Sequence, residues 1–411
     1  MTDSRDRVAV HLDAPELGPG RQVGSLSRER GGAESVLSFA YRPEWVADPD
    51  AFPIDPFLPL YEGEQFLRQM PGVLADAAPD RWGRTLLERR EAQVAADETR
   101  RPRPLDEWDF LVGVNDGTRM GALRLFRDGA FLDDGPLAVP PSTRLRELEQ
   151  LAREVEEGIP RDDDRERWIA MLLAPGSSLG GARPKANFTG DDGSLWIAKF
   201  PSREDRYDVG AWEYVAGRLA AAARIAVPAS RQLRLASPYR TYCARRFDRD
   251  RGNRRLYASA MSLAGDRDHG EAGYLDIARA IRDFGDPDAI ADDLRQLFRR
   301  VVFNVLVGNR DDHLRNHGFL RAAGGWRLAP TFDVNPSLDK GEHSLALDAS
   351  QRLPDLDIVR ETAPLYRLTP AEADEVFADV RRAVAGWREE ARRIEVPAEE
   401  IDRMAAAFES G

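Results

Sequence analysis

The residues of this chain that are best suited to chemistry lie in one short stretch, GNRDDHLRN, at positions 308–316. Asp311 and Asn316 stand five positions apart, which is the spacing of the Asp and the Asn in a protein-kinase catalytic loop. There the Asp takes the proton of the acceptor hydroxyl and the Asn holds a metal ion. Asp312 lacks this spacing and receives no role. Asp333, in the segment APTFDV, is a candidate for the second metal ligand, so the pattern predicts phosphoryl transfer.

The same stretch has two other interpretations. His313 and His317 stand four positions apart and on a helix could bind zinc, but HExxH is absent and no third ligand is evident. Alternatively, the Asp and Asn side chains only cap a turn. Gly308 and Gly318 flank the run and favour a loop over a helix. The spacing therefore needs support from the rest of the chain.

An apolar helix is expected to carry this loop. Its apolar residues repeat at helical spacing over 294–306, with Asp292 or Asp293 as the expected cap and Gly308 as the expected end. A catalytic base must be held in a fixed position, so a buried helix is a suitable mount for Asp311.

Lysine is rare in this chain. Among its 59 basic residues, only Lys185, Lys199 and Lys340 are lysines. Lysine is a compact, flexible point charge that suits a phosphate contact in a tight site. Lys199 is expected in a covered apolar row on the second strand of the hairpin NFTGDDGSLWIAKF. A buried ammonium needs an anion, and the candidates are a nucleotide phosphate, Glu213 of the next predicted helix, or a purely structural ion pair.

A loop of small residues, SSLGGARPK, lies upstream at positions 177–185. Its glycines let backbone N–H groups approach an anion, and Lys185 adds charge. It matches neither GxxxxGK[ST] nor GxGxxG, and taken alone it favours an ordinary flexible loop. A phosphate-binding role follows only in combination with the stretch at 308–316.

Length and composition indicate a globular protein of more than one domain. A chain of 411 residues is longer than one hydrophobic core usually supports. Its 42% hydrophobic and 32% charged residues are ordinary values for a globular protein. The charged start MTDSRDRVAV and the interruption of the apolar stretch 219–227 by Arg224 predict neither export nor a membrane anchor. The net charge of −12 argues against direct nucleic-acid coating, and the single Cys243 fits a reducing compartment.

Three parts are predicted along the chain, with boundaries 1–135, 136–247 and 248–411. The first shows no metal or phosphate motif and is expected to be an accessory module. Its predicted elements are strands at 8–12, 36–41 and 120–126 and a helix at 86–96. The second contains the phosphate loop and Lys199. The third contains the 308–316 stretch and Asp333, followed by predicted helices at 370–387 and 398–408.

Taken together, these motifs resemble the HipA family of serine/threonine kinases, the toxins of bacterial type II toxin–antitoxin pairs. The C-terminal segments that carry the resemblance are SSLGGARPK, WIAKFPS, RRFDR, GNRDDHLRNHGFL and LAPTFDV. The resemblance extends to the N-terminal subdomain of the family through the segments VGSL, LSFAYRPEWV, PLYEGEQF, PDRWGRTLL and MGALRLF. It therefore covers nearly the whole chain. The resemblance implies an α+β, two-lobed kinase-like fold, related to lipid-kinase-like enzymes, with a β-rich N-terminal subdomain and a largely helical C-terminal lobe.

The resemblance also implies a role for each motif. Asp311 would be the catalytic base, and Asn316 and Asp333 the ligands of Mg²⁺. Ser178 would be the autophosphorylated serine, although Ser177 stands beside it. The positions that bind ATP would be Gly180, Gly181, Ala182, Arg183, Pro184 and Lys185 in the phosphate loop, Lys199, the hinge residues Arg245, Arg246 and Phe247, and His313, Asn316 and Asp333.

The implied function is that of a cytoplasmic, ATP- and Mg²⁺-dependent protein kinase that acts as a toxin and is associated with persistence. Its substrate would be a translation component such as an aminoacyl-tRNA synthetase. A cognate DNA-binding antitoxin would be its partner and its only link to DNA. The alternatives are a small-molecule phosphotransferase that resembles aminoglycoside phosphotransferases, and a catalytically silent nucleotide-binding regulatory partner.

Overall fold

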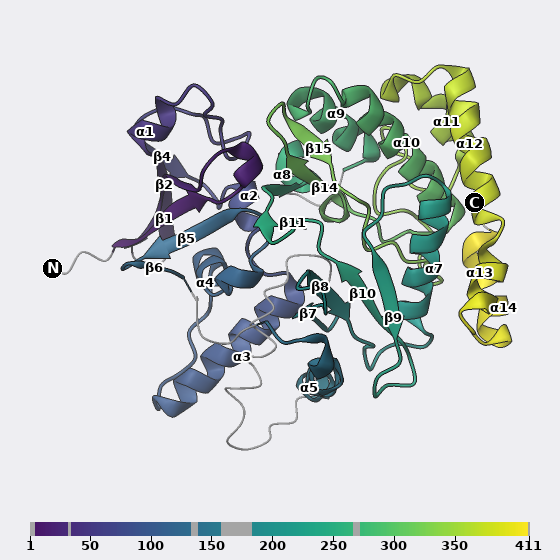
Figure 1. Ribbon diagram of the computed structural model, residues 1–411, viewed down its shortest axis with the longest axis horizontal. Helices are drawn as coiled ribbons and strands as arrows, with labels where there is room; N and C mark the ends of the chain where they lie inside the picture. The colour runs from purple at the N-terminus through teal and green to yellow at the C-terminus, as the bar shows by residue number, and fades with distance from the viewer. Residues whose placement is uncertain (1–4, 32–33, 133–138, 158–182, 266–271, 410–411) are drawn as a thin grey trace. The chain divides into compact units, whose positions relative to one another are not determined.

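The structure is a computed structural model that describes residues 5–31, 34–132, 139–157, 183–265 and 272–409 (Figure 1). By internal contacts the chain forms two units: a first unit of Met1–Trp196 and Asp248–Ala258, and a second unit of Ile197–Phe247 and Ser259–Gly411. This division differs from the three parts expected from the motifs, which remain a prediction. The first unit is rich in strands and the second is mainly helical, as expected for the α+β class.

A six-stranded antiparallel sheet forms the main part of the first unit, in the order β4-β3-β2-β1-β5-β6. On β1, Val8 and Val10 are fully buried while their neighbours are more exposed, which is the period of two expected for a strand with one covered face. Strand β2 was not predicted, because Val23 and Leu26 are its only large apolar residues. The strands are β1 (Arg5–Leu12), β2 (Arg21–Gly31), β3 (Glu34–Tyr41), β4 (Glu64–Leu67), β5 (Leu123–Arg127) and β6 (Ala130–Phe131).

The helices of the first unit include the one predicted over 86–96, which is longer in the structure and starts after Asp80. Helix α3 begins at Arg81, where the side chain of Asp80 accepts a hydrogen bond from the backbone N–H of Gly83 at 3.1 Å. Strand β7 (Lys185–Thr189) and the start of β8 (Leu195–Lys199) form the predicted hairpin, with Gly193 in the left-handed region at its turn. The helices are α1 (Pro43–Val46), α2 (Gly72–Ala75), α3 (Arg81–Asp97), α4 (Glu107–Val112) and α5 (Leu145–Glu157).

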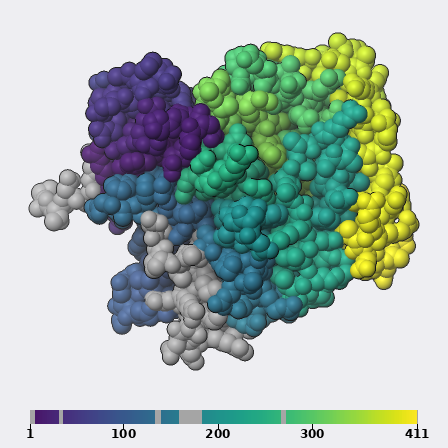
Figure 2. Space-filling view, viewed as in Figure 1, coloured from purple at the N-terminus to yellow at the C-terminus, as the bar shows by residue number. Residues whose placement is uncertain are grey.

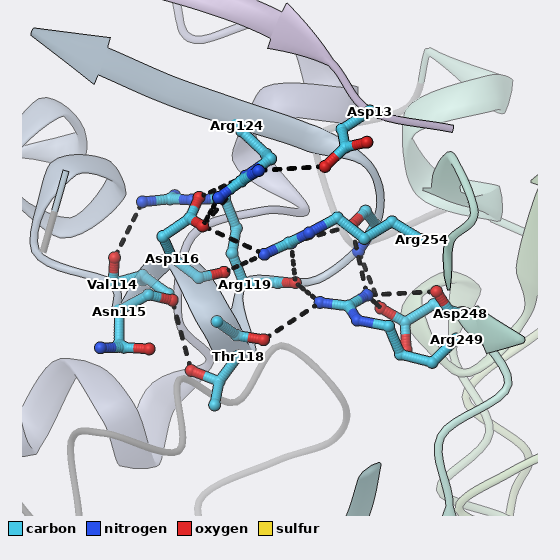
Figure 3. Close-up of polar contacts among 12 residues, drawn as sticks. Asp13, Val114, Asn115, Asp116, Thr118, Arg119, Arg124, Asp248, Arg249 and Arg254 are labelled. Atoms are coloured by element: carbon cyan, nitrogen blue, oxygen red, sulfur yellow. Dashed lines mark hydrogen bonds and ion pairs between the residues drawn. The ribbon is translucent and has the colours of Figure 1, made fainter. Parts of the chain in front are cut away.

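The chain returns to the first unit in a small hairpin, β11 (Arg249–Asp250) and β12 (Asn253–Arg254). A buried polar cluster fixes this hairpin (Figure 3). The Asp116 carboxylate accepts from Arg124 at 2.5 Å and from Arg254 at 3.2 Å, and Asp248 accepts from Arg249 at 2.5 Å. Burial lowers the pKa of Arg254 to about 10, with Asp116 opposing the shift, so the guanidinium stays charged at neutral pH.

The second unit begins within β8, which continues into a sheet of order β8-β10-β9. Helix α12 packs on α7 and α10, and α13 packs on α7, so the C-terminal helices (yellow) line one side of this unit (Figures 1 and 2). Among the residues described, no helix combines the length and apolar character needed to cross a membrane. The strands are β9 (Ser230–Leu233), β10 (Thr241–Arg245), β13 (Tyr257–Ser259, at the unit boundary), β14 (Gly318–Arg321) and β15 (Trp326–Leu328), and the helices are α7 (Val209–Ala222), α8 (Ala260–Ala264), α9 (Tyr274–Phe284), α10 (Ile290–Leu306), α11 (Leu356–Glu361), α12 (Pro370–Val384), α13 (Trp387–Arg393) and α14 (Ala398–Phe408).

Helix α10 is the buried helix that the sequence predicted, but its start was predicted wrongly. It begins at Ile290, so Asp292 and Asp293 lie in its first turn and neither is the cap. Asp293 instead accepts hydrogen bonds from the side chain of Arg327 and the backbone of Leu328, both at 3.0 Å. Gly308 follows the helix with φ +65°, and a Cβ there would lie 2.6 Å from the carbonyl oxygen of Ala407, so only glycine fits this turn.

Asp116→Asn tests the anchoring of the hairpin. The substitution leaves the buried Arg254 and the half-buried Arg124 without their shared carboxylate, so we expect a loss of about 3 kcal/mol in the free energy of unfolding of the first unit. Thermal unfolding and hydrogen exchange of first-unit peptides measure the loss. Asp128→Asn makes the same chemical change in an exposed pair with Arg127, 3.8 Å apart, and should cost less than about 1 kcal/mol. Equal losses in the two variants would contradict the anchoring role.

Candidate active site

The predicted catalytic stretch forms a loop that leaves the end of α10. The loop ends in a 3₁₀ turn, Leu314–Asn316, and there the side-chain Nδ2 of Asn316 donates to the backbone oxygen of Asp311 at 3.3 Å. The Asp311 side chain is 68% exposed, whereas Asn316 is buried. The five-residue spacing thus closes a loop that presents one carboxylate to solvent and holds one carboxamide inside.

Asp312, which received no role in the sequence-based prediction, anchors this loop to two helices. Its Oδ2 accepts from the Tyr274 hydroxyl at 2.7 Å and from Asn304 Nδ2 at 2.8 Å, and lies 2.7 Å from His317 Nε2. Burial alone would raise the pKa of Asp312, but its interactions with His317 and Tyr274 outweigh burial and lower that pKa. Asp312 is therefore a buried, charged anchor beside the exposed Asp311.

The zinc interpretation of the two histidines finds no support in the described part of the chain. His317 directs Nε2 at Asp312, and the residues described contain no group of three His, Cys, Asp or Glu side chains arranged to hold a metal ion. His313 starts the 3₁₀ turn and is half-buried. The pair therefore belongs to a loop, which is the interpretation that the flanking glycines favoured.

Lys199 is the central buried cation of the second unit. Its Nζ donates to Glu213 at 2.5 Å and to Asp333 at 2.6 Å. Burial lowers the pKa of the ammonium, but the two carboxylates outweigh burial and raise it, so Lys199 stays charged. The predicted pairing with Glu213 is confirmed, and the contact with Asp333 was not foreseen.

Asp333 is held in an uncommon backbone conformation next to the predicted hinge. Its φ is +59°, in the left-handed region that aspartate tolerates better than most residues. Such conformations occur preferentially at functional sites. The ring of Phe332 packs on the ring of Phe247 with centroids 5.5 Å apart, and the backbone N–H of Arg245 donates to Ala229 at 2.8 Å. The hinge segment and the Asp333 segment are therefore in direct contact.

The oxygen atoms of Asn316 and Asp333 fit a magnesium ion. Asn316 Oδ1 is buried and has no hydrogen-bond partner among the described residues. A buried amide oxygen without a partner is costly unless a ligand supplies one. The Asp333 side chain is 22% exposed and offers carboxylate oxygens. Carboxylate and carbonyl oxygens are the ligands that Mg²⁺ prefers.

The predicted phosphate loop is described only at its end. Ser177, Ser178, Gly180, Gly181 and Ala182 lie outside the described residues. Three further predicted residues, Arg183, Pro184 and Lys185, belong to the first unit.

Lys185 is buried at the start of β7 and has a protein partner. Its Nζ donates to Asp80 at 2.5 Å, and its backbone oxygen accepts from Trp82 Nε1 at 3.1 Å. The lysine is thus tied to the start of α3. Its contact with a phosphate stays a prediction.

The chain that follows Asp333 runs back along the catalytic loop, and we call residues 335–344 the return segment. The backbone N–H of Ser337 donates to Gly308 at 2.9 Å, and that of Asn335 donates to Asn309 Oδ1 at 3.3 Å. The backbone N–H and the hydroxyl of Ser344 both donate to the Arg310 carbonyl at 3.0 Å. No local pattern predicts this pairing, because these bonds join residues about thirty positions apart.

Comparison with known proteins identifies the family. Residues 177–387 match the family model described as the HipA-like C-terminal domain, and residues 17–126 match the HipA N-terminal domain. The chain belongs to the HipA family, as the motifs indicated. No curated protein matches it in a sequence search.

The fold is shared with a solved structure that matches nearly the whole chain. HipA of Shewanella oneidensis MR-1, from a toxin–antitoxin complex with HipB and its operator DNA, matches at 16% identity and a TM-score of 0.67, over 98% of this chain and 95% of that chain. The Helicobacter pylori proinflammatory kinase CtkA matches at 15% identity and a TM-score of 0.44, over 57% of this chain and 90% of that chain. The first likeness confirms the expected HipA fold.

His343, in the return segment, makes the stability of the site depend on pH. Burial lowers its pKa to about 4, Asp312 opposes the shift and Arg310 adds to it. The unfolded chain binds a proton at this residue near pH 6.5 and the folded chain does not until about pH 4, so the unfolding free energy falls as pH falls through this window.

Denaturant unfolding of the wild type and of His343→Gln at about pH 7.5 and about pH 5.5 measures the effect, and the wild type should lose roughly 1 kcal/mol more than the variant. An equal loss in both proteins would show that His343 is not buried in its neutral form.

Proposed function

We propose that this chain is an ATP- and Mg²⁺-dependent serine/threonine protein kinase, the toxin of a toxin–antitoxin pair. The observation that carries the proposal is the contact of Lys199 with both Glu213 and Asp333, in the unit that also contains Asp311 and Asn316. In protein kinases the pair of strand lysine and helix glutamate and the metal-binding aspartate must be in place together for transfer. Membership of the HipA family supports the same activity.

In the proposed reaction each residue has one task. Asp311 accepts the proton of a Ser or Thr hydroxyl of the substrate protein, because it is the exposed carboxylate of the loop. Asn316 and Asp333 hold Mg²⁺, which neutralises charge on the phosphates when bound. Lys199 has three N–H donors, of which two face carboxylates, so the third can contact a phosphate oxygen.

The remaining contacts of the proposal follow from the family motifs. Gly180, Gly181, Ala182, Arg183, Pro184 and Lys185 would cover the phosphates, Arg245, Arg246 and Phe247 would hold adenine, and His313 would contact the nucleotide. Ser178 would be the site of autophosphorylation.

The proposed partners also follow from the family. A cognate DNA-binding antitoxin is supported by the Shewanella structure, which contains HipB and its operator DNA. The proposed substrate is a cytoplasmic translation component such as an aminoacyl-tRNA synthetase.

Asp311→Asn tests the chemistry. The amide cannot accept the hydroxyl proton, so phosphate transfer to protein should fall by about 10² to 10⁴-fold. The affinity for Mg·ATP, measured by calorimetry, should be retained, because Asp311 is assigned to the acceptor rather than to the nucleotide. Asp402→Asn, which changes an exposed carboxylate on α14 of the same unit, should transfer phosphate at the wild-type rate.

Phosphate transfer by Asp311→Asn at the wild-type rate would show that Asp311 is not the catalytic base. Transfer by the wild type to metabolites but to no protein would favour the small-molecule phosphotransferase. Nucleotide binding without any transfer would favour the silent regulatory partner.

A further inference from the structure

Lys340 is the side chain that contacts the proposed catalytic base. Its Nζ donates to Oδ1 of Asp311. The Lys340 side chain is 45% exposed and that of Asp311 68%, so the pair faces solvent. Each of the three lysines of the chain pairs with an aspartate, but Lys185 and Lys199 are buried and Lys340 is exposed.

The backbone on both sides of Lys340 is tied to the residues that precede Asp311. The carbonyl of Lys340 itself accepts from the Arg310 guanidinium. On one side Ser337 donates to Gly308, and on the other Ser344 donates twice to the Arg310 carbonyl, at 2.9 and 3.0 Å respectively. The return segment therefore delivers the lysine to Asp311 through backbone bonds and not by a chance contact of two flexible side chains.

Stability does not account for this arrangement. An exposed ion pair contributes only about 0–1 kcal/mol, because water screens the charges and the long side chains lose conformational freedom. A cation beside the base has a larger effect on the rate of phosphoryl transfer than on stability, because negative charge moves at that point during the reaction. The retention of lysine among 59 basic residues that are otherwise arginine fits a compact ammonium at a reacting centre.

We propose that Lys340 is a further catalytic residue of the kinase reaction put forward above, on which this inference rests. Its ammonium holds the Asp311 carboxylate before the acceptor hydroxyl binds, and then stabilises the charge of the phosphoryl group in transfer. In that step the bond between the γ-phosphorus and the bridging oxygen of ATP breaks, and a bond to the hydroxyl oxygen forms. The hydroxyl proton passes to Asp311, ADP leaves, and Lys340 keeps its proton.

Lys340→Met and Lys340→Arg test this role in the full-length chain with Mg·ATP at saturation. Methionine keeps the length of the side chain and removes the charge, so the rate of phosphate transfer should fall about 100-fold. The dissociation constant of Mg·ATP should stay within about threefold of wild type, because the lost contact acts in the transition state. Lys340→Arg keeps the charge and should recover part of the rate.

A matched control separates catalysis from a general effect of charge. Arg382→Met removes an exposed cation of the same unit whose partner is Asp379, 3.3 Å away on the same helix. This variant should transfer phosphate at the wild-type rate. Thermal unfolding of all three variants should give midpoints close to that of the wild type, since the cation that is replaced is exposed in each case.

The outcomes distinguish this inference from the proposal beneath it. Transfer by Lys340→Met at the wild-type rate, with Asp311→Asn inactive, would overturn the role of Lys340 and leave the kinase proposal intact. A loss of rate that only follows a loss of folded protein would also overturn it. Absence of transfer by the wild type would overturn both.

Discussion

The pairing of one buried ammonium, that of Lys199, with two carboxylates holds distant parts of the second unit together. Lys199 sits on a strand among apolar side chains, where an unpaired charge would be too costly to keep. Glu213 on helix α7 and Asp333 in the segment after β15 compensate this charge, so three distant parts of the chain converge on one nitrogen atom. Removing either carboxylate would leave a buried charge imbalance, which ties the helix, the strand and the Asp333 segment to one another.

Two adjacent carboxylates are assigned different roles, one structural and one catalytic. Asp312 is buried and receives hydrogen bonds from α9 and α10 through Tyr274 and Asn304, which fixes the backbone of the loop. Asp311 faces solvent and contacts only Lys340 through its carboxylate among the interactions described. A rigid anchor next to an accessible base is what precise positioning of a substrate hydroxyl requires. The proposed kinase thus places its reactive group on an element held by residues that take no part in the reaction.

The sequence predicted the parts of the site that depend on local pattern. Alternation and helical spacing predicted strands within β1, β3 and β5, the hairpin of β7 and β8, and the buried helix α10. The flanking glycines Gly308 and Gly318 indicated the loop that the structure shows between them. The bonds of Asp312 and the return segment join residues separated by up to thirty-eight positions, and no local pattern encodes them. The cap of α10 was missed because Asp293 is bound by Arg327, which only the folded chain brings near.

The location of the metal ion tests the central claim most directly. A crystal structure with Mn²⁺ and a non-hydrolysable ATP analogue would locate the metal by anomalous scattering. The account predicts the metal on Asn316 Oδ1 and the Asp333 carboxylate, with Lys199 Nζ in contact with a phosphate oxygen. A nucleotide bound away from Lys199, or a metal held by other residues, would contradict it.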